Sequence, residues 1–133
     1  MTEDVGEFLE DLGPGTGWAS GEETDYLLRA VEAGFVLHYE PSLSVRHEWP
    51  EARFDRASDS RAYRYGLGSG RVLRTHGYPL WFVVYRVLQL VGGAAMFLLT
   101  ARPAKARYFF LMGLGRTCGW FGAGDYARRP PST

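Results

Sequence analysis

The sequence has few features of a secreted protein or of a protein that binds metal through cysteine thiolates. Cys118 is the only cysteine among 133 residues, so the chain has no disulfide framework and no cluster of thiolate ligands. The amino terminus is acidic and has no apolar run, which argues against a secretory signal peptide. Nothing here calls for an oxidising compartment, and the length fits one ordinary domain.

Each end of the chain also lacks charge of one sign. No basic residue precedes Arg29, and beyond Asp59 the only acidic residue is Asp125, although the formal net charge is zero. The arginines of the second half flank apolar stretches, a pattern that favours contact with an anionic membrane surface. No groove-reading motif accompanies them, so we expect a membrane partner and no nucleic acid.

Apolar and aromatic residues are plentiful, at 46% and 15% of the chain, which favours a folded body. A glycine-rich loop at residues 13–17 precedes a predicted helix over residues 21–33. Ser20 is the expected N-cap of this helix, with Glu23 as its capping-box partner. The loop and the helix start together form a place where a site can be built.

Two short segments after this helix have the composition of β-strands. Residues 35–39 are rich in β-formers, and residues 43–47 alternate between apolar and polar side chains. Helix, strand, turn and strand in succession predict an α/β fold. Residues 52–74 then have a polar helical pattern, whose middle is interrupted by three glycines.

Residues 78–101 are apolar apart from Arg86, Gln89 and Thr100. The length could cross a bilayer, but an arginine in the first third argues against a simple crossing, so we favour an interfacial or re-entrant helix. A second, shorter apolar stretch covers residues 108–123. A buried helical hairpin of a soluble protein is the alternative, because apolar runs alone do not distinguish a protein core from a bilayer.

Three carboxylates, Glu22, Glu23 and Asp25, lie in the first turn of the predicted helix. Residues 22 and 25 are helical neighbours, whereas residue 23 points elsewhere. A carboxylate near the free N–H groups of a helix start stays ionised, which suits a general base. Acidic residues are also routine there because they stabilise the helix dipole, so this pattern alone leaves both roles open.

Four motifs follow one another along this region. They are Gly-Glu-Glu-Thr-Asp-Tyr-Leu-Leu-Arg at 21–29, Ala-Gly-Phe at 33–35, Tyr-Glu-Pro at 39–41 and Val-Arg-His at 45–47. Their order and spacing resemble the carboxyl-terminal core of family 2 glycosyltransferases. The resemblance implies that residues 1–50 are the acceptor-side part of a GT-A, Rossmann-like α/β domain. A polar helical connector (51–77), membrane-associating helices (78–123) and a flexible tail (124–133) would follow.

The resemblance also implies roles for individual residues. Glu23 falls at the position of the family's aspartate and would be the general base, with Asp25 kept as the alternative. Trp18 and Glu22 would contact the acceptor, and His47 would help to hold a divalent metal, Mg²⁺ or Mn²⁺. Glutamate in place of aspartate departs from the family pattern and displaces the carboxylate by one methylene, a change that can cost rate.

The implied reaction is sugar transfer, with inversion, from a nucleotide-sugar donor to a polysaccharide or glycolipid acceptor at the cytoplasmic face of the cell membrane. The family's amino-terminal nucleotide-binding half, with its Asp-x-Asp metal motif, has no counterpart in the sequence. We therefore expect little activity without that half. The rival hypothesis is a non-catalytic, membrane-associated binding or interaction module.

Overall fold

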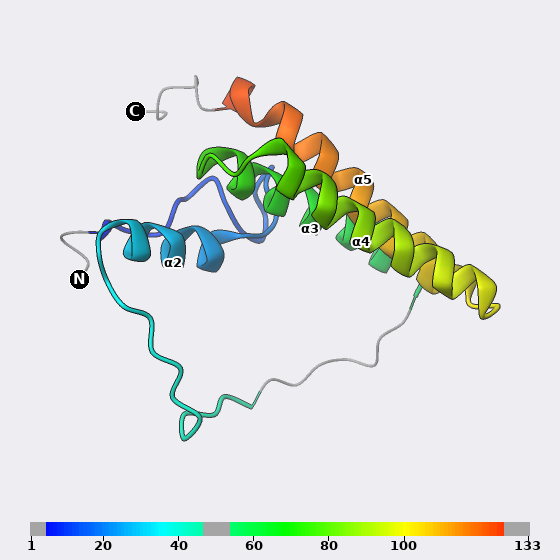
Figure 1. Ribbon diagram of the computed structural model, residues 1–133, viewed down its shortest axis with the longest axis horizontal. Coiled ribbons are helices and arrows are strands. Elements are labelled where there is room, and N and C mark those ends of the chain that lie inside the picture. Colours follow the sequence, from blue (N-terminus) through cyan, green and yellow to red (C-terminus); the bar gives the residue numbers. More distant parts are fainter. Residues whose placement is uncertain (1–4, 47–53, 127–133) are drawn as a thin grey trace.

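The computed structural model describes residues 5–46 and 54–126, and the side chains of all of these except residues 123–126. The described ranges contain four named helices (Figure 1). They are α2 (Glu22–Glu32), α3 (Arg56–Thr75), α4 (Leu80–Leu99) and α5 (Pro103–Tyr126). Within these ranges the extended pairing is limited to an isolated bridge between Leu12 and Trp18.

The predicted α/β, Rossmann-like GT-A fold is therefore wrong for the described part of the chain, which is all-helical. Residues 35–39 and the described part of 43–47 form no strand. They run as an extended segment away from the helices (Figure 1). The physical reason is that a strand needs a neighbour to pair its N–H and C=O groups, and β-propensity without such a neighbour does not form a sheet.

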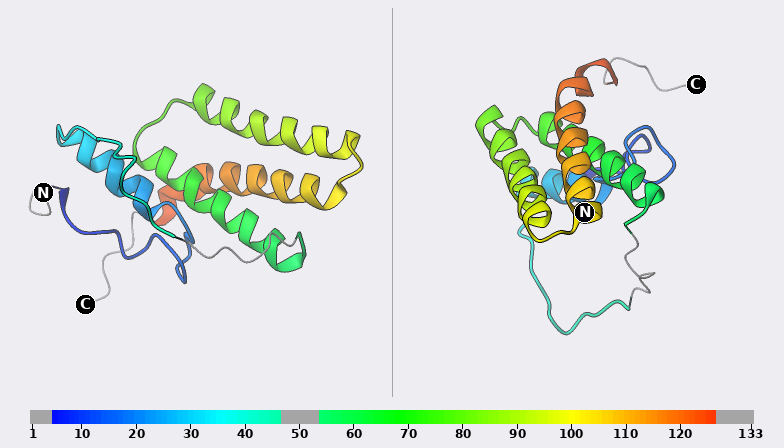
Figure 2. Two further views of the ribbon diagram at one scale, coloured as in Figure 1. Left: turned by 90° about the horizontal axis from the view of Figure 1, so that it is seen from below. Right: turned by 90° about the vertical axis from the view of Figure 1, so that its right-hand side faces the viewer.

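Helix α5 lies between α3 and α4, and the three form one elongated body (Figure 2). Helices α3 and α5 run in the same direction, since Gly66 of α3 meets Met112 of α5 and Gly70 meets Arg116. Helix α4 runs in the opposite direction to α5 and packs against its other side. The predicted helical regions at 52–74 and 78–101 are thus confirmed as α3 and α4, within a few residues at each end.

The contact between α3 and α5 is a glycine seam, formed by Gly66 and Gly70 on α3 and by Gly115 and Gly119 on α5. A Cβ built on any of these four glycines would stand only 2.1 to 2.2 Å from a backbone oxygen of the other helix. Small residues spaced four apart allow two helix backbones to touch in this way. Two of the three glycines that interrupt the predicted helix, Gly66 and Gly70, are therefore residues that bring α3 and α5 together.

The start of α2 is held against the middle of α3. Gly21 is the N-cap, with a left-handed φ of 103°, and it makes no side-chain cap hydrogen bond. The predicted capping box of Ser20 and Glu23 is therefore wrong, because the Ser20 hydroxyl donates to the Tyr65 carbonyl at 3.0 Å instead. A Cβ on Gly68 would stand 2.0 Å from the Ser20 carbonyl oxygen, so the two backbones are in direct contact.

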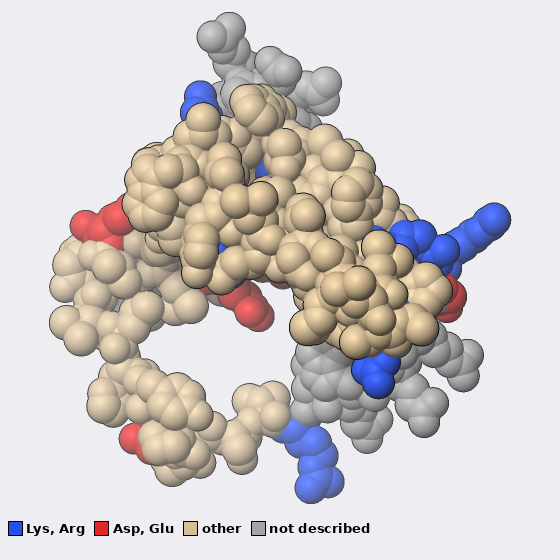
Figure 3. Space-filling view, turned by 45° about the vertical axis from the view of Figure 1, so that its right-hand side comes forward, with Lys and Arg blue, Asp and Glu red and all other residues tan. Residues whose placement is uncertain are grey.

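Helix α4 turns most of its apolar surface outward. By length and composition it is the one helix among the described residues that could cross a membrane, and only 11% of its most apolar stretch is buried. Leu88 and Leu99, for example, are 60% and 89% exposed. Figure 3 shows one face of the whole molecule, and few charged side chains lie over the middle of that face. A soluble core helix would be largely covered, whereas an exposed apolar face is typical of a surface that contacts another protein or a membrane.

Candidate functional site

The three first-turn carboxylates point into different surroundings. Glu22 folds back onto the glycine-rich loop, where a Cβ on Gly13 would stand 3.2 Å from its carboxylate carbon. Glu23 is exposed to solvent, whereas Asp25 is 1% exposed. The structure therefore does not gather the three carboxylates into one cluster, and each has a different chemical setting.

Asp25 is held by polar contacts on both of its oxygens. Arg29 donates from Nε to Oδ2 at 2.9 Å, since residues four apart share a face of a helix. His76, at the carboxyl end of α3, lies with Nε2 3.0 Å from Oδ1. A carboxylate with both oxygens so engaged and no exposed surface has no free position from which to take a proton from a substrate.

His76 also contacts a second carboxylate, since its Nδ1 lies 2.7 Å from Glu32 Oε1. Both ring nitrogens can donate at once only when the imidazole carries two protons. Arg29 in turn donates to the backbone carbonyls of Val5 and Glu7. This polar network, centred on the buried Asp25, ties the amino-terminal segment, α2 and the end of α3 together. Sequence reasoning missed it, because His76 is 51 residues from Asp25.

Trp18, predicted to contact the acceptor, lies in the core. It packs with Leu12 and Val72, and the Arg71 guanidinium lies over its ring at 5.6 Å. This environment accounts for Trp18 as a packing residue, and the acceptor contact stays a prediction. The other predicted contact, at Glu22, also stays a prediction.

His47, the predicted metal contact, lies outside the described residues. Among the described residues, no group of three or more His, Cys, Asp or Glu side chains is placed to hold a metal ion.

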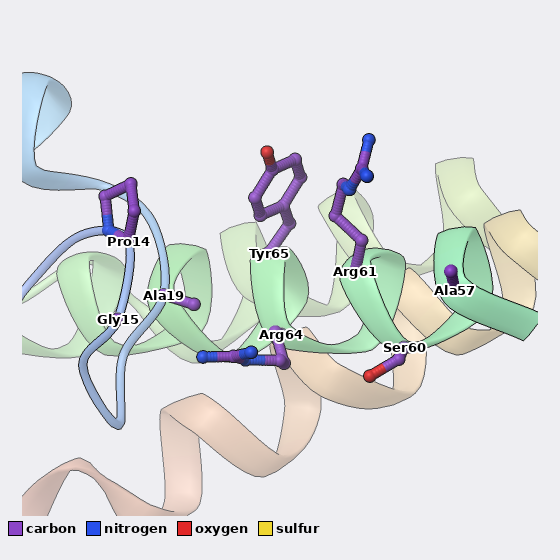
Figure 4. A pocket seen from close by; sticks show the side chains of 8 residues that line it. All are labelled: Pro14, Gly15, Ala19, Ala57, Ser60, Arg61, Arg64 and Tyr65. Carbon is purple, nitrogen blue, oxygen red and sulfur yellow. The ribbon is translucent and has the colours of Figure 1, made fainter.

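A small pocket of about 250 Å³ lies between the glycine-rich loop and α3, and we call it the loop pocket. Pro14, Gly15 and Ala19 form the loop side, as seen in Figure 4. On the α3 side, Arg64 extends toward the loop and donates to the Thr16 carbonyl at 3.3 Å. The α3 side is completed by Ala57, Ser60, Arg61 and Tyr65.

A larger cavity of about 500 Å³ lies where the start of α2 meets the three long helices. We call it the arginine cavity, because Arg86 of α4 and Arg116 of α5 both line it. Thr24, in the first turn of α2 and next to Glu23, lines it as well. Burial, and secondly the charge of Arg86, lower the pKa of Arg116 below its ordinary value.

The contacts of the two arginines are to neutral groups. Arg116 donates from Nε to the Ser69 hydroxyl at 3.2 Å and from Nη1 to the Arg86 carbonyl at 3.3 Å. Arg86 donates from Nη1 to the Gln89 amide oxygen at 3.0 Å. Neither guanidinium forms an ion pair with a carboxylate in residues 5–46 or 54–126. Two positive charges therefore share this cavity without an anion from the described part of the protein.

Comparison of the chain with protein-family models, curated proteins and solved structures finds no match. The functional argument therefore depends on the residues and their geometry. Sequence reasoning located the start of α2 and the apolar helices, but it did not bring Arg86 and Arg116 together. Their spacing of 30 residues carries no local signal, since only the antiparallel packing of α4 on α5 makes them neighbours.

Proposed function

We propose that this chain is the acceptor-side part of a family 2-like glycosyltransferase. It would act at the cytoplasmic face of a membrane, together with a nucleotide-binding half. The reaction is sugar transfer, with inversion, from a nucleotide-sugar to a glycan or lipid-linked acceptor. The observation that carries the proposal is the contrast between Asp25, which is buried and fully paired, and Glu23, which is exposed beside a residue of the arginine cavity.

The proposed chemistry assigns one role to Glu23. Its carboxylate takes the proton from an acceptor hydroxyl while that oxygen attacks the anomeric carbon and the nucleoside diphosphate leaves. A first-turn position suits a negatively charged side chain, because the free N–H groups of the helix start favour negative charge. The predicted metal contact, His47, lies outside the described residues, so no step is assigned to the metal here.

The segment at residues 35–46 supports the need for a partner half. Val36, Tyr39, Leu43 and Val45 are between 80% and 93% exposed, although all four are large apolar residues. Side chains of this kind gain free energy when another surface covers them. A nucleotide-binding half that packs on this segment would supply that cover and would bring the donor to α2.

A non-catalytic membrane-associated module is the second candidate, and the exposed apolar surface of α4 favours it. Such a module would bind lipid or a partner protein without turnover. Glu23 would then have no chemical role, and its replacement would leave every measurable property of the chain unchanged.

The test is transfer from nucleotide-sugars by the chain in membrane lipids, with Mg²⁺ or Mn²⁺, alone and with a nucleotide-binding domain of a family 2 enzyme added. We expect Glu23→Gln to lower turnover by about 100-fold or more. Glu10→Gln is the matched control, because Glu10 is an exposed carboxylate outside the first turn of α2. Turnover that survives Glu23→Gln unchanged would refute the assignment of the base. Lipid binding without turnover in any combination would favour the binding module.

A further inference from the structure

The arginine cavity contains more positive charge than the described protein can neutralise. Arg116 is half-buried, and its partners are a hydroxyl and a carbonyl oxygen, while Arg86 lies at the rim of the same cavity. Removing a charge from water without a counter-ion costs free energy, and two like charges side by side add to that cost. An anion bound between the two guanidinium groups would offset both costs.

The remaining walls of the cavity are amphipathic. Hydroxyl groups of Ser20, Thr24 and Ser69 supply polar contacts, whereas the wall toward α4 includes the ring of Phe82. The volume of about 500 Å³ lies within the roughly 300–1,000 Å³ range of small-molecule pockets. A bare inorganic anion would leave most of this space and its apolar wall unused.

We propose that the arginine cavity binds the phosphate group of an amphipathic lipid, with the phosphate between Arg86 and Arg116 and the apolar chain leaving along α4. Guanidinium groups bind phosphate oxygens through charge-assisted hydrogen bonds, often two at a time. The same chemistry would accept a phosphatidic acid or an isoprenoid phosphate. The inference goes beyond the proposed function, because it requires no reaction at Glu23.

The position of the cavity favours a lipid over a soluble anion. Trp81 and Tyr85, which are 70% and 52% exposed, lie on the same end of α4 as Arg86. Aromatic side chains of this kind concentrate at the level of the lipid head groups. Arg86 is six residues after Leu80, or about 9 Å along the helix axis, so it lies close to these aromatic residues. The phosphate of a neighbouring lipid is thus within reach of the cavity.

The experiment measures binding of short-chain phosphatidic acid to the full chain in detergent micelles, with diacylglycerol and inorganic phosphate as the two comparison ligands. The variants are Arg86→Gln and Arg116→Gln. The matched control is Arg61→Gln, which removes the same charge from an exposed site on α3 outside the cavity. Arg116→Lys separates the loss of charge from the loss of the guanidinium fork, and thermal unfolding of every variant checks its fold.

We expect phosphatidic acid to bind, diacylglycerol not to bind, and each cavity variant to weaken phosphatidic acid binding by about tenfold or more. Arg61→Gln should leave that affinity unchanged. Because Arg86 is exposed, its variant should fold even if Arg116→Gln does not. Equal weakening by Arg61→Gln would overturn the site and indicate general charge attraction. Inorganic phosphate that binds as tightly as the lipid would overturn the lipid assignment and leave a soluble-anion site.

Discussion

At the scale of single residues, Asp25 shows how one carboxylate can be removed from the list of candidate bases. It is buried, and both of its oxygens are paired with cationic or polar partners from α2 and from the end of α3. Glu23, two residues earlier in the same helix, is exposed. In the first turn of α2, one acidic residue is therefore buried in a polar network and another is open to solvent.

We expect Asp25→Asn to destabilise the fold by roughly 3 kcal/mol, since it leaves the guanidinium of Arg29 without its carboxylate partner and disturbs the contact with His76. Urea unfolding followed by circular dichroism measures the change. Glu23→Gln is the control and should shift the midpoint little, because Glu23 is exposed. Equal midpoints for Asp25→Asn and the unaltered chain would show that the network contributes nothing to stability.

The sequence allowed part of this arrangement to be predicted. The pair of Asp25 and Arg29 follows from helical spacing alone, because residues four apart share a face. The contact with His76 depends on how α2 docks onto α3, which no local pattern records. The burial of Asp25 is therefore an observation that the sequence could not supply, and it underlies the proposal that Glu23 is the base.

At the scale of helices, the glycine seam determines how α3 and α5 pack. The glycines recur at a spacing of four on both helices, a pattern visible in the sequence. Because glycine also lowers helix propensity, the same residues indicated a break in the helix. Tertiary packing overrides that propensity here, since only glycine allows the two backbones to touch.

We expect Gly70→Ala and Gly119→Ala each to destabilise the protein by roughly 2 kcal/mol or more, because the added methyl group would overlap a backbone oxygen of the other helix. Gly92→Ala on α4 is the matched control, since nothing lies within 4 Å of its Cβ position. That control should be neutral or stabilising by up to about 1 kcal/mol. Thermal unfolding measures all three, and a seam variant as stable as the control would contradict the packing.

The strand predictions failed at this same scale, and for a different reason. Residues 35–39 have strand composition, but a strand is stabilised by its neighbours rather than by its own sequence. The described chain provides no neighbour for them. The helices could be predicted because their hydrogen bonds lie within each segment, whereas the strands depended on a partner that the pattern could not supply.

At the scale of the whole molecule, the three long helices lie side by side, with polar α3 at one edge, α5 in the middle and apolar α4 at the other edge. Polar α3 lies beside α5 along most of its length, and Asp59 of α3 pairs with Arg107 of α5 near the turn between α4 and α5. A crossing by α4 would carry this ion pair and the exposed arginines of α3 into the hydrocarbon, at high cost. For the proposed membrane contact, this arrangement therefore favours α4 lying along the surface over α4 crossing the bilayer.

Cysteine labelling in sealed vesicles tests this orientation. In a Cys118→Ser background, we expect single cysteines at Leu80 and at Leu99 to react equally with a membrane-impermeant maleimide added outside. Both positions are exposed at the ends of α4, so reactivity would report the side of the membrane. Labelling of one position and protection of the other until the vesicles are opened would show that α4 crosses.

The extended segment at residues 35–46 joins α2 to the rest of the molecule, yet the docking of α2 does not depend on it. Direct contacts join the parts of the chain that precede and follow this segment. Ser20 contacts α3 at Gly68, and Asp25 and Glu32 contact His76. Chymotrypsin should therefore cut at Tyr39 or Leu43, which are 85% and 80% exposed, before it cuts the helices. The two fragments should separate on a denaturing gel and co-elute as one particle under native conditions, so the protein can be assembled from two separately made pieces.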